Sequence, residues 1–218
     1  MTQIFSPAAD TWLRLAVAGF LSVCGGGAVA AIGFARSAYV TSVDIAPHQP
    51  VPFSHRHHVA ELGLDCRYCH ADVERGPKAG LPPTATCMTC HSQIWTNAAI
   101  LAPVRQSLAE NKPLRWVRVA KLPDYVFFRH DIHIAKGVGC VTCHGRIDKM
   151  PLTYRAHAFT MQFCLDCHRD PAPNLRPANR ITDMTWKPTG SPRDAGAKIA
   201  AHVGIRSGEL IHCYVCHR

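Results

Sequence analysis

The longest apolar stretch of the chain covers residues 15–35 without a charged side chain, and Arg14 and Arg36 bracket it. As a helix, its 21 residues would extend about 30 Å, the thickness of the hydrocarbon layer of a membrane. A cleaved signal peptide is the rival interpretation, because the letters AVAA resemble a small-residue cleavage site. The weakly basic segment before the run and the length of the run disfavour cleavage, so we expect a retained transmembrane anchor.

Beyond Arg36 the alternation of apolar and polar positions keeps neither a helical nor a strand period for long. A helical stretch is expected within 98–117, ending before Lys112–Pro113, whereas residues 171–198, with five prolines, are predicted to form an extended loop. We therefore expect an N-terminal segment and anchor at 1–36. Residues 37–218 should form a mainly α-helical and irregular domain with few or no strands.

Cysteine is the anomaly in the composition. Ten of the 11 cysteines fall into five C-x-x-C pairs, and a histidine follows each pair at once. C-x-x-C-H is the attachment signal of c-type haem, in which two thiols bond to the porphyrin and the adjacent histidine ligates the iron. The five motifs, numbered in chain order, are Cys66–Cys69–His70, Cys87–Cys90–His91, Cys140–Cys143–His144, Cys164–Cys167–His168 and Cys213–Cys216–His217.

Other interpretations of the cysteine pairs are disfavoured. A disulfide framework would leave the histidines unexplained, and a zinc module needs four ligands, usually with a widely spaced second half. Five covalently attached c-type haems are therefore expected, with a short helix at each motif. The haem domain has about 36 residues for each haem, so the porphyrins themselves would supply its apolar core.

The formal charge of the polypeptide is +9. Taken alone, such a balance indicates nucleic acid or anionic lipid as a partner. Each haem carries two propionates, however, so five haems would add roughly −10 and bring the protein close to neutral. We therefore expect no nucleic-acid binding, and we expect some of the lysines and arginines to pair with propionates.

An internal repeat organises the haem domain. Block one, residues 53–91, contains FSHRHH, CRYCH and CMTCH, and block two, residues 128–168, contains FRHDIH, CVTCH and CLDCH. Both begin with F-x-H-x-x-H and continue with two attachment motifs. The first histidine precedes the first cysteine by 11 residues in block one and by 10 in block two.

A low-spin haem needs a second axial ligand, usually histidine or methionine. Both blocks resemble class III multihaem cytochromes, in which the first histidine of such a pair ligates the haem of its own block and the second reaches a neighbouring haem. The resemblance implies that His55 and His130 serve the first haem of their blocks. It also implies that His58 and His133 cross to other haems.

The fifth motif lies outside the duplication, at 202–217, and resembles half a block. His202 precedes Cys213 by 11 residues, so its spacing makes it the candidate second ligand there. Met161 is a rival ligand, placed just before Cys164, where it would raise the potential of that haem. Three further rivals are more typical of packing or surface positions: Met150, His157 and His212.

No catalytic residue is expected. All five motifs end in histidine and spare histidines are abundant, so the pattern does not indicate an open coordination position for a substrate. The chain also has no P-loop or dinucleotide fingerprint. His57 is expected to be a bystander, because block two has Ile132 at that place. The pattern favours electron transfer over haem-based catalysis.

The segments around the motifs are similar to one family. HSQIW, PVRQSLAENKPLRWVRVAKLPDYVFFRHDIHIAKGVGC, CHGRIDKM and FTMQFCLDCHR resemble the pentahaem cytochrome subunit of alternative complex III, a bacterial quinol:electron-acceptor oxidoreductase. The resemblance covers about residues 53–186, with four motifs, and is weak over the last 30 residues.

This resemblance implies an electron-transfer subunit that is not an enzyme on its own. Its partners would be a polytopic quinol-oxidising membrane subunit, an iron–sulfur subunit related to molybdopterin enzymes, and a monohaem cytochrome c subunit. A soluble carrier or a terminal oxidase would accept the electrons. Because haem c is attached outside the cytoplasmic membrane, the haem domain is expected in the periplasm. The alternative is a stand-alone, membrane-anchored quinol dehydrogenase that feeds a periplasmic reductase.

Overall fold

The computed structural model describes residues 4–217, so the outermost residues of the two expected domains, 1–3 and 218, lie outside the described part. The chain divides into two compact units, with the boundary between Val43 and Asp44. Each unit is described by itself.

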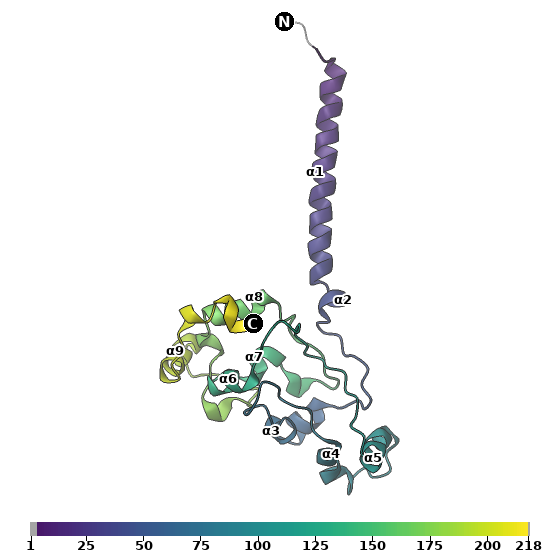
Figure 1. The fold of residues 1–218 in the computed structure, drawn as a ribbon, viewed down its shortest axis with the longest axis vertical. Coiled ribbons are helices and arrows are strands. Elements are labelled where there is room, and N and C mark those ends of the chain that lie inside the picture. Colours follow the sequence, from purple (N-terminus) through teal and green to yellow (C-terminus); the bar gives the residue numbers. More distant parts are fainter. Residues whose placement is uncertain (1–3, 218) are drawn as a thin grey trace. The chain divides into compact units, whose positions relative to one another are not determined.

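The first unit is dominated by one long helix, α1 (Pro7–Arg36), followed by the short helix α2 (Ala38–Thr41) (Figure 1). The Ser6 hydroxyl accepts a hydrogen bond from the Ala9 amide and so caps the N-terminus of α1. The α1 helix is long and apolar enough to cross a membrane. Its apolar side chains are exposed, so they need lipid or another helix as a neighbour.

The second unit is built from short helices and loops (Figure 1). Residues 4–217 contain no strand, only isolated bridges such as the antiparallel one between Val138 and Leu175, which confirms the expected fold class. The α-helices are α3 (Cys66–Cys69), α4 (Thr84–His91), α5 (Ala102–Ala109), α6 (His130–Ala135), α7 (Cys140–His144), α8 (Met161–Arg169), α9 (Pro192–His202) and α10 (Cys213–Cys216). A π-helix, η1 (Arg56–Glu61), and five short 3₁₀ turns complete the unit: η2 (Ala99–Leu101), η3 (Ile147–Lys149), η4 (Ala172–Asn174), η5 (Ala178–Arg180) and η6 (Ser207–Glu209).

Each attachment motif lies on a helix, as expected: motifs one to five occupy α3, α4, α7, α8 and α10. Local capping explains part of this. The Asp65 carboxylate accepts a hydrogen bond from the Arg67 amide at the start of α3. The Thr160 hydroxyl does the same for Phe163 at the start of α8. The expected helix within 98–117 is α5.

The polypeptide of the second unit buries few side chains. The main apolar cluster is formed by Val51, Leu101 and Val104, with Met88 and Trp116 packed against it. No large side chain among the described residues is fully buried. A unit of this length normally buries a larger core, so the thin polypeptide core agrees with haems supplying most of the apolar interior.

The expected extended loop at 171–198 is wrong in its last part, because α9 begins at Pro192. The Ser191 hydroxyl caps this helix, and proline occupies its first turn, where a missing amide proton costs nothing. The α9 helix packs closely on η4, since a Cβ at Gly196 would collide with the Ala172 carbonyl oxygen. The pair Ser191–Pro192 is therefore typical of the start of a helix, and the number of prolines in 171–198 hid this signal.

Candidate functional site

Eight of the predicted ligand histidines share one arrangement. In each, the ring Nδ1 lies within hydrogen-bond distance of a backbone carbonyl or, once, of a hydroxyl. A carbonyl only accepts, so Nδ1 carries the proton and Nε2 is left free to bind a metal. The histidines and their partners are His55 with Thr153 Oγ1 (2.8 Å), His58 with Ser54 O (2.9 Å), His70 with Gly80 O (2.8 Å), His91 with Ile94 O (3.3 Å), His130 with Pro77 O (2.9 Å), His133 with Arg129 O (2.6 Å), His168 with Leu210 O (2.8 Å) and His217 with Tyr125 O (3.1 Å).

Three pairs of these imidazoles face one another across a nearly constant gap. The ring centres are 6.3 Å apart for His58 and His91, 6.4 Å for His130 and His144, and 6.1 Å for His133 and His168. A metal–imidazole bond of about 2 Å on each side of one iron sets two ring centres about 6 Å apart. The gaps therefore fit one iron each.

His55 and His70 form a fourth neighbouring pair. Burial, together with the nearby imidazoles of His70, His58 and His144, lowers the pKa of His55 to about 4. Burial likewise lowers the pKa of His144 to about 4, with His130 and His70 as neighbours. Both rings are therefore neutral at physiological pH, and the neutral imidazole is the form that ligates a metal.

A phenylalanine holds the two upstream histidines of each block in place. The Phe53 ring stacks on His58 at 4.3 Å and meets His55 edge-on at 5.0 Å. In block two, Phe128 lies 4.4 Å from His133 and meets the ring of His130 edge-on at 4.8 Å. The phenylalanine belongs to the repeated F-x-H-x-x-H pattern, but the sequence did not reveal that it contacts both rings.

No model of a known protein family matches the chain. The chain is, however, similar to a curated protein: it is 30% identical over 209 residues to the multihaem cytochrome c subunit of menaquinone reductase from Nitratidesulfovibrio vulgaris. The alignment covers 89% of this chain and 91% of that subunit. The chain belongs to this family of multihaem cytochrome c subunits. As a multihaem cytochrome c, the chain carries covalently attached c-type haems and takes part in electron transport.

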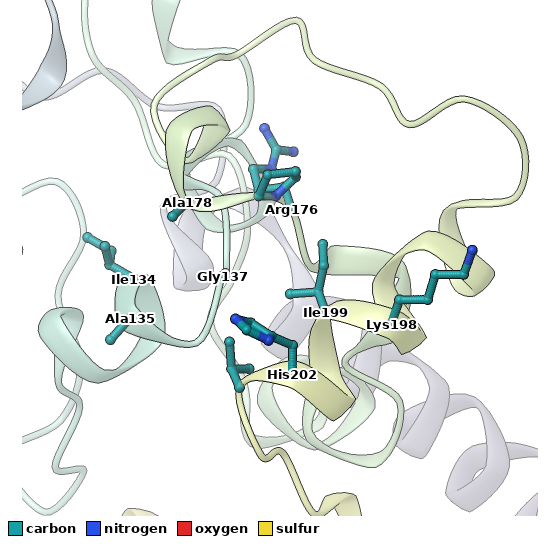
Figure 2. A pocket seen from close by; sticks show the side chains of 10 residues that line it. Ile134, Ala135, Gly137, Arg176, Ala178, Lys198, Ile199 and His202 are labelled. Atoms are coloured by element: carbon teal, nitrogen blue, oxygen red, sulfur yellow. The ribbon is translucent and has the colours of Figure 1, made fainter.

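The fifth motif of this multihaem cytochrome c is arranged differently from the others. The His217 ring lies 5.9 Å from the Tyr125 ring and not opposite a second imidazole. His202 lines a pocket of about 430 Å³ between α6 and α9, where it faces Ile134 and Ala135 (Figure 2). Its ring has no hydrogen bond within residues 4–217, so His202 lacks the Nδ1 partner that eight of the predicted ligand histidines have.

The remaining histidine and methionine candidates of the cytochrome have other neighbours. Met161 is 68% exposed at the start of α8, whereas Met150 is 2% exposed and belongs to the polypeptide core. The bystander His57 pairs with the Glu61 carboxylate at 2.8 Å. The rings of His157 and His212 stack on aromatic side chains, those of Phe163 and Tyr214.

Proposed function

We propose that this multihaem cytochrome c is the membrane-anchored electron-relay subunit of a quinone-linked oxidoreductase and carries five haems. Three observations support the proposal: the five attachment motifs, the apolar helix α1, and the relative that belongs to a menaquinone reductase. The haem domain would lie on the periplasmic side of the membrane, where haem c is attached.

The paired imidazoles carry the proposal. Three upstream histidines lie about 6 Å, ring centre to ring centre, from the histidine of a motif in their own block, and His55 has His70 as its first electrostatic neighbour. The second histidine of each block would therefore reach the second motif of that block and not a distant haem. We assign four axial pairs on this basis, for haems one to four in order: His55 with His70, His58 with His91, His130 with His144, and His133 with His168. In the fifth haem, His217 would be the motif ligand; Met161 and His202 are not assigned.

The bound haems would supply one-electron redox chemistry. The chain's own residues would fix how each iron is held. Two imidazoles would hold the iron at each of four sites and would leave no position there for a substrate. The carbonyl partners of Nδ1 would fix the tautomer and the orientation of these rings. Such a set of residues suits relay of electrons and not conversion of a substrate.

Two settings fit this role, and they differ in the direction of electron flow. The sequence resemblance favours an alternative complex III, in which a polytopic subunit oxidises quinol. An iron–sulfur subunit related to molybdopterin enzymes and a monohaem cytochrome would complete that complex. The relative from Nitratidesulfovibrio vulgaris favours a menaquinone-reducing complex, in which the haems would receive electrons outside the membrane.

Gentle solubilisation followed by purification through the cytochrome tests the proposal. We expect integral membrane subunits to co-purify, and we expect the haems of the intact complex to be reduced by a quinol analogue or oxidised by a quinone analogue. Faster reduction by quinol identifies the first setting, and faster oxidation by quinone identifies the second. A cytochrome that purifies alone and oxidises quinol by itself would overturn the proposal in favour of a stand-alone quinol dehydrogenase.

A further inference from the structure

The first and second motifs adjoin one another within block one. The Tyr68 hydroxyl, inside motif one, is 2.9 Å from the Thr89 hydroxyl inside motif two. Direct side-chain contact thus places the attachment points of haems one and two next to each other.

The first and third motifs adjoin one another across the two blocks. The side chains of Cys66 and Cys140 are direct neighbours, and residues 181–182 contact both motifs. The Ile181 carbonyl accepts a hydrogen bond from the Cys140 amide at 3.1 Å, and the Thr182 hydroxyl donates one to Asp65, the residue before Cys66, at 2.8 Å. Close by, the amide and the ring of His130 both bond to the Pro77 carbonyl of block one. Cys66 and Cys140 are equivalent residues of the repeat, so the blocks meet through their first motifs.

The series continues from the third motif to the fourth and fifth. The His144 ring of motif three lies 6.4 Å from the Phe159 ring, and the Phe159 ring lies 5.5 Å from the ring of Phe163, on the helix that carries motif four. The His168 ring also donates a hydrogen bond to the Leu210 carbonyl, just before motif five, at 2.8 Å.

We infer that the five attachment sites form an unbranched series in space in the order two, one, three, four, five. The inference rests on the five-haem relay proposed above and specifies its internal path. Residues 4–217 contain no hydrogen bond between the second and third motifs, which chain order would make neighbours. Haems two and five would be the ends of the relay, where electrons enter or leave. Haem one, although first along the chain, would lie inside it.

Two substitutions distinguish the inferred order of the haems from their order along the chain, because the two orders predict different numbers of affected haems. His55→Met and His58→Met, made in the intact complex, should raise the midpoint potential of haem one and haem two respectively. At a poised potential that haem is reduced and diamagnetic while the others stay ferric. Pulsed dipolar EPR then counts how many ferric haems lose a close paramagnetic neighbour.

The inferred order predicts that His55→Met affects two haems and His58→Met affects one. Chain order predicts the reverse, one haem for His55→Met and two for His58→Met, and that result would overturn the inference. His133→Met is the matched control, since haem four has two neighbours in either order. If one variant fails to assemble, the other decides alone. If neither methionine changes the ligand signature of any haem, the axial pairs of the proposed function are at fault and not the order.

Discussion

Block one and block two place their two upstream histidines in the same way against a phenylalanine, although the turn is π-helical in block one and α-helical in block two. The distances from the phenylalanine to its two histidines agree within a few tenths of an ångström between the blocks. Yet block one has one more residue between its second histidine and the following glycine, Gly63 or Gly137. Residues 56–61 absorb the extra residue as a π-helix, whereas block two forms an ordinary α-helix over 130–135.

The comparison shows which residues fix the positions of the two upstream histidines in each block. The Leu62 amide bonds to the His57 carbonyl five residues back, the spacing of a π-turn. Gly63 and Gly137 then end both turns with positive φ values of 72° and 89°, a conformation that favours glycine. The phenylalanine before each turn and the glycine after it are equivalent, so the histidines keep their places while the turn varies. Single-turn π-helical segments of this kind are frequent at functional sites.

Removal of an axial histidine should have the largest effect and tests whether the blocks are equivalent. His55→Ala and His130→Ala should each convert one haem of the five to the high-spin state, because one axial position is left without a protein ligand. Absorption and EPR spectra measure the high-spin fraction. His57→Ala is the matched control in block one and should leave the spectra unchanged. A spectrum unaffected by His55→Ala would remove His55 from the ligands.

The residue before the first cysteine is expected to contribute differently to the free energy of unfolding in the two blocks. Block one has Asp65, which caps α3, while block two has Gly139, where a Cβ would collide with the buried Arg176 side chain. Gly139→Ala should therefore lower the free energy of unfolding by about 1–3 kcal/mol through overpacking. Asp65→Ala should cost about 1 kcal/mol through loss of the cap. Denaturant unfolding of the haem-loaded protein measures both, and equal costs would contradict the difference.

Deletion of Glu61 should convert block one to the spacing of block two at little cost. The ion pairs of Glu61 with His57 and Arg56 are exposed, and such pairs contribute less than about 1 kcal/mol. We expect all low-spin haem to be retained and the π-turn to become an α-turn. Glu61→Ala, which keeps the chain length, is the control. Loss of a low-spin haem on deletion, but not on Glu61→Ala, would show that the π-turn is required and does not merely absorb a residue.

The smallest expected effect is the acid-side pH dependence that the Asp65 carboxyl contributes, since Gly139 stands at the equivalent place in block two. The hydrogen bond from Arg67 is the main cause that lowers the pKa of Asp65 to about 2. Because the folded pKa is depressed, the stabilisation is present above pH about 4 and is lost as pH falls towards 2. The pair is well exposed, so solvent screening keeps the effect below about 1 kcal/mol. Asp65→Asn should reduce the acid-side slope of unfolding curves, and an unchanged slope would contradict the role of the Arg67 hydrogen bond.

Local patterns predicted much of this molecule. The attachment motifs, the apolar anchor helix and the F-x-H-x-x-H repeat are each readable within a few residues, and the helices at all five motifs followed from the spacing of the thiols. The sequence did not predict what depends on contacts between distant segments. Examples are the Pro77 carbonyl that orients His130 and the meeting of Cys66 with Cys140. His202 was predicted as a ligand from spacing alone, and its ring lacks the Nδ1 hydrogen bond that eight of the predicted ligand histidines have.

The central claim is that four haems are held by two histidines each, with both histidines from one block. Near-infrared magnetic circular dichroism of the fully oxidised, purified complex tests it most directly, because bis-histidine, histidine–methionine and high-spin haems have different charge-transfer bands. After subtraction of haems in other subunits, four haems of this chain should show the bis-histidine band. Fewer than four would contradict the axial pairs assigned to blocks one and two.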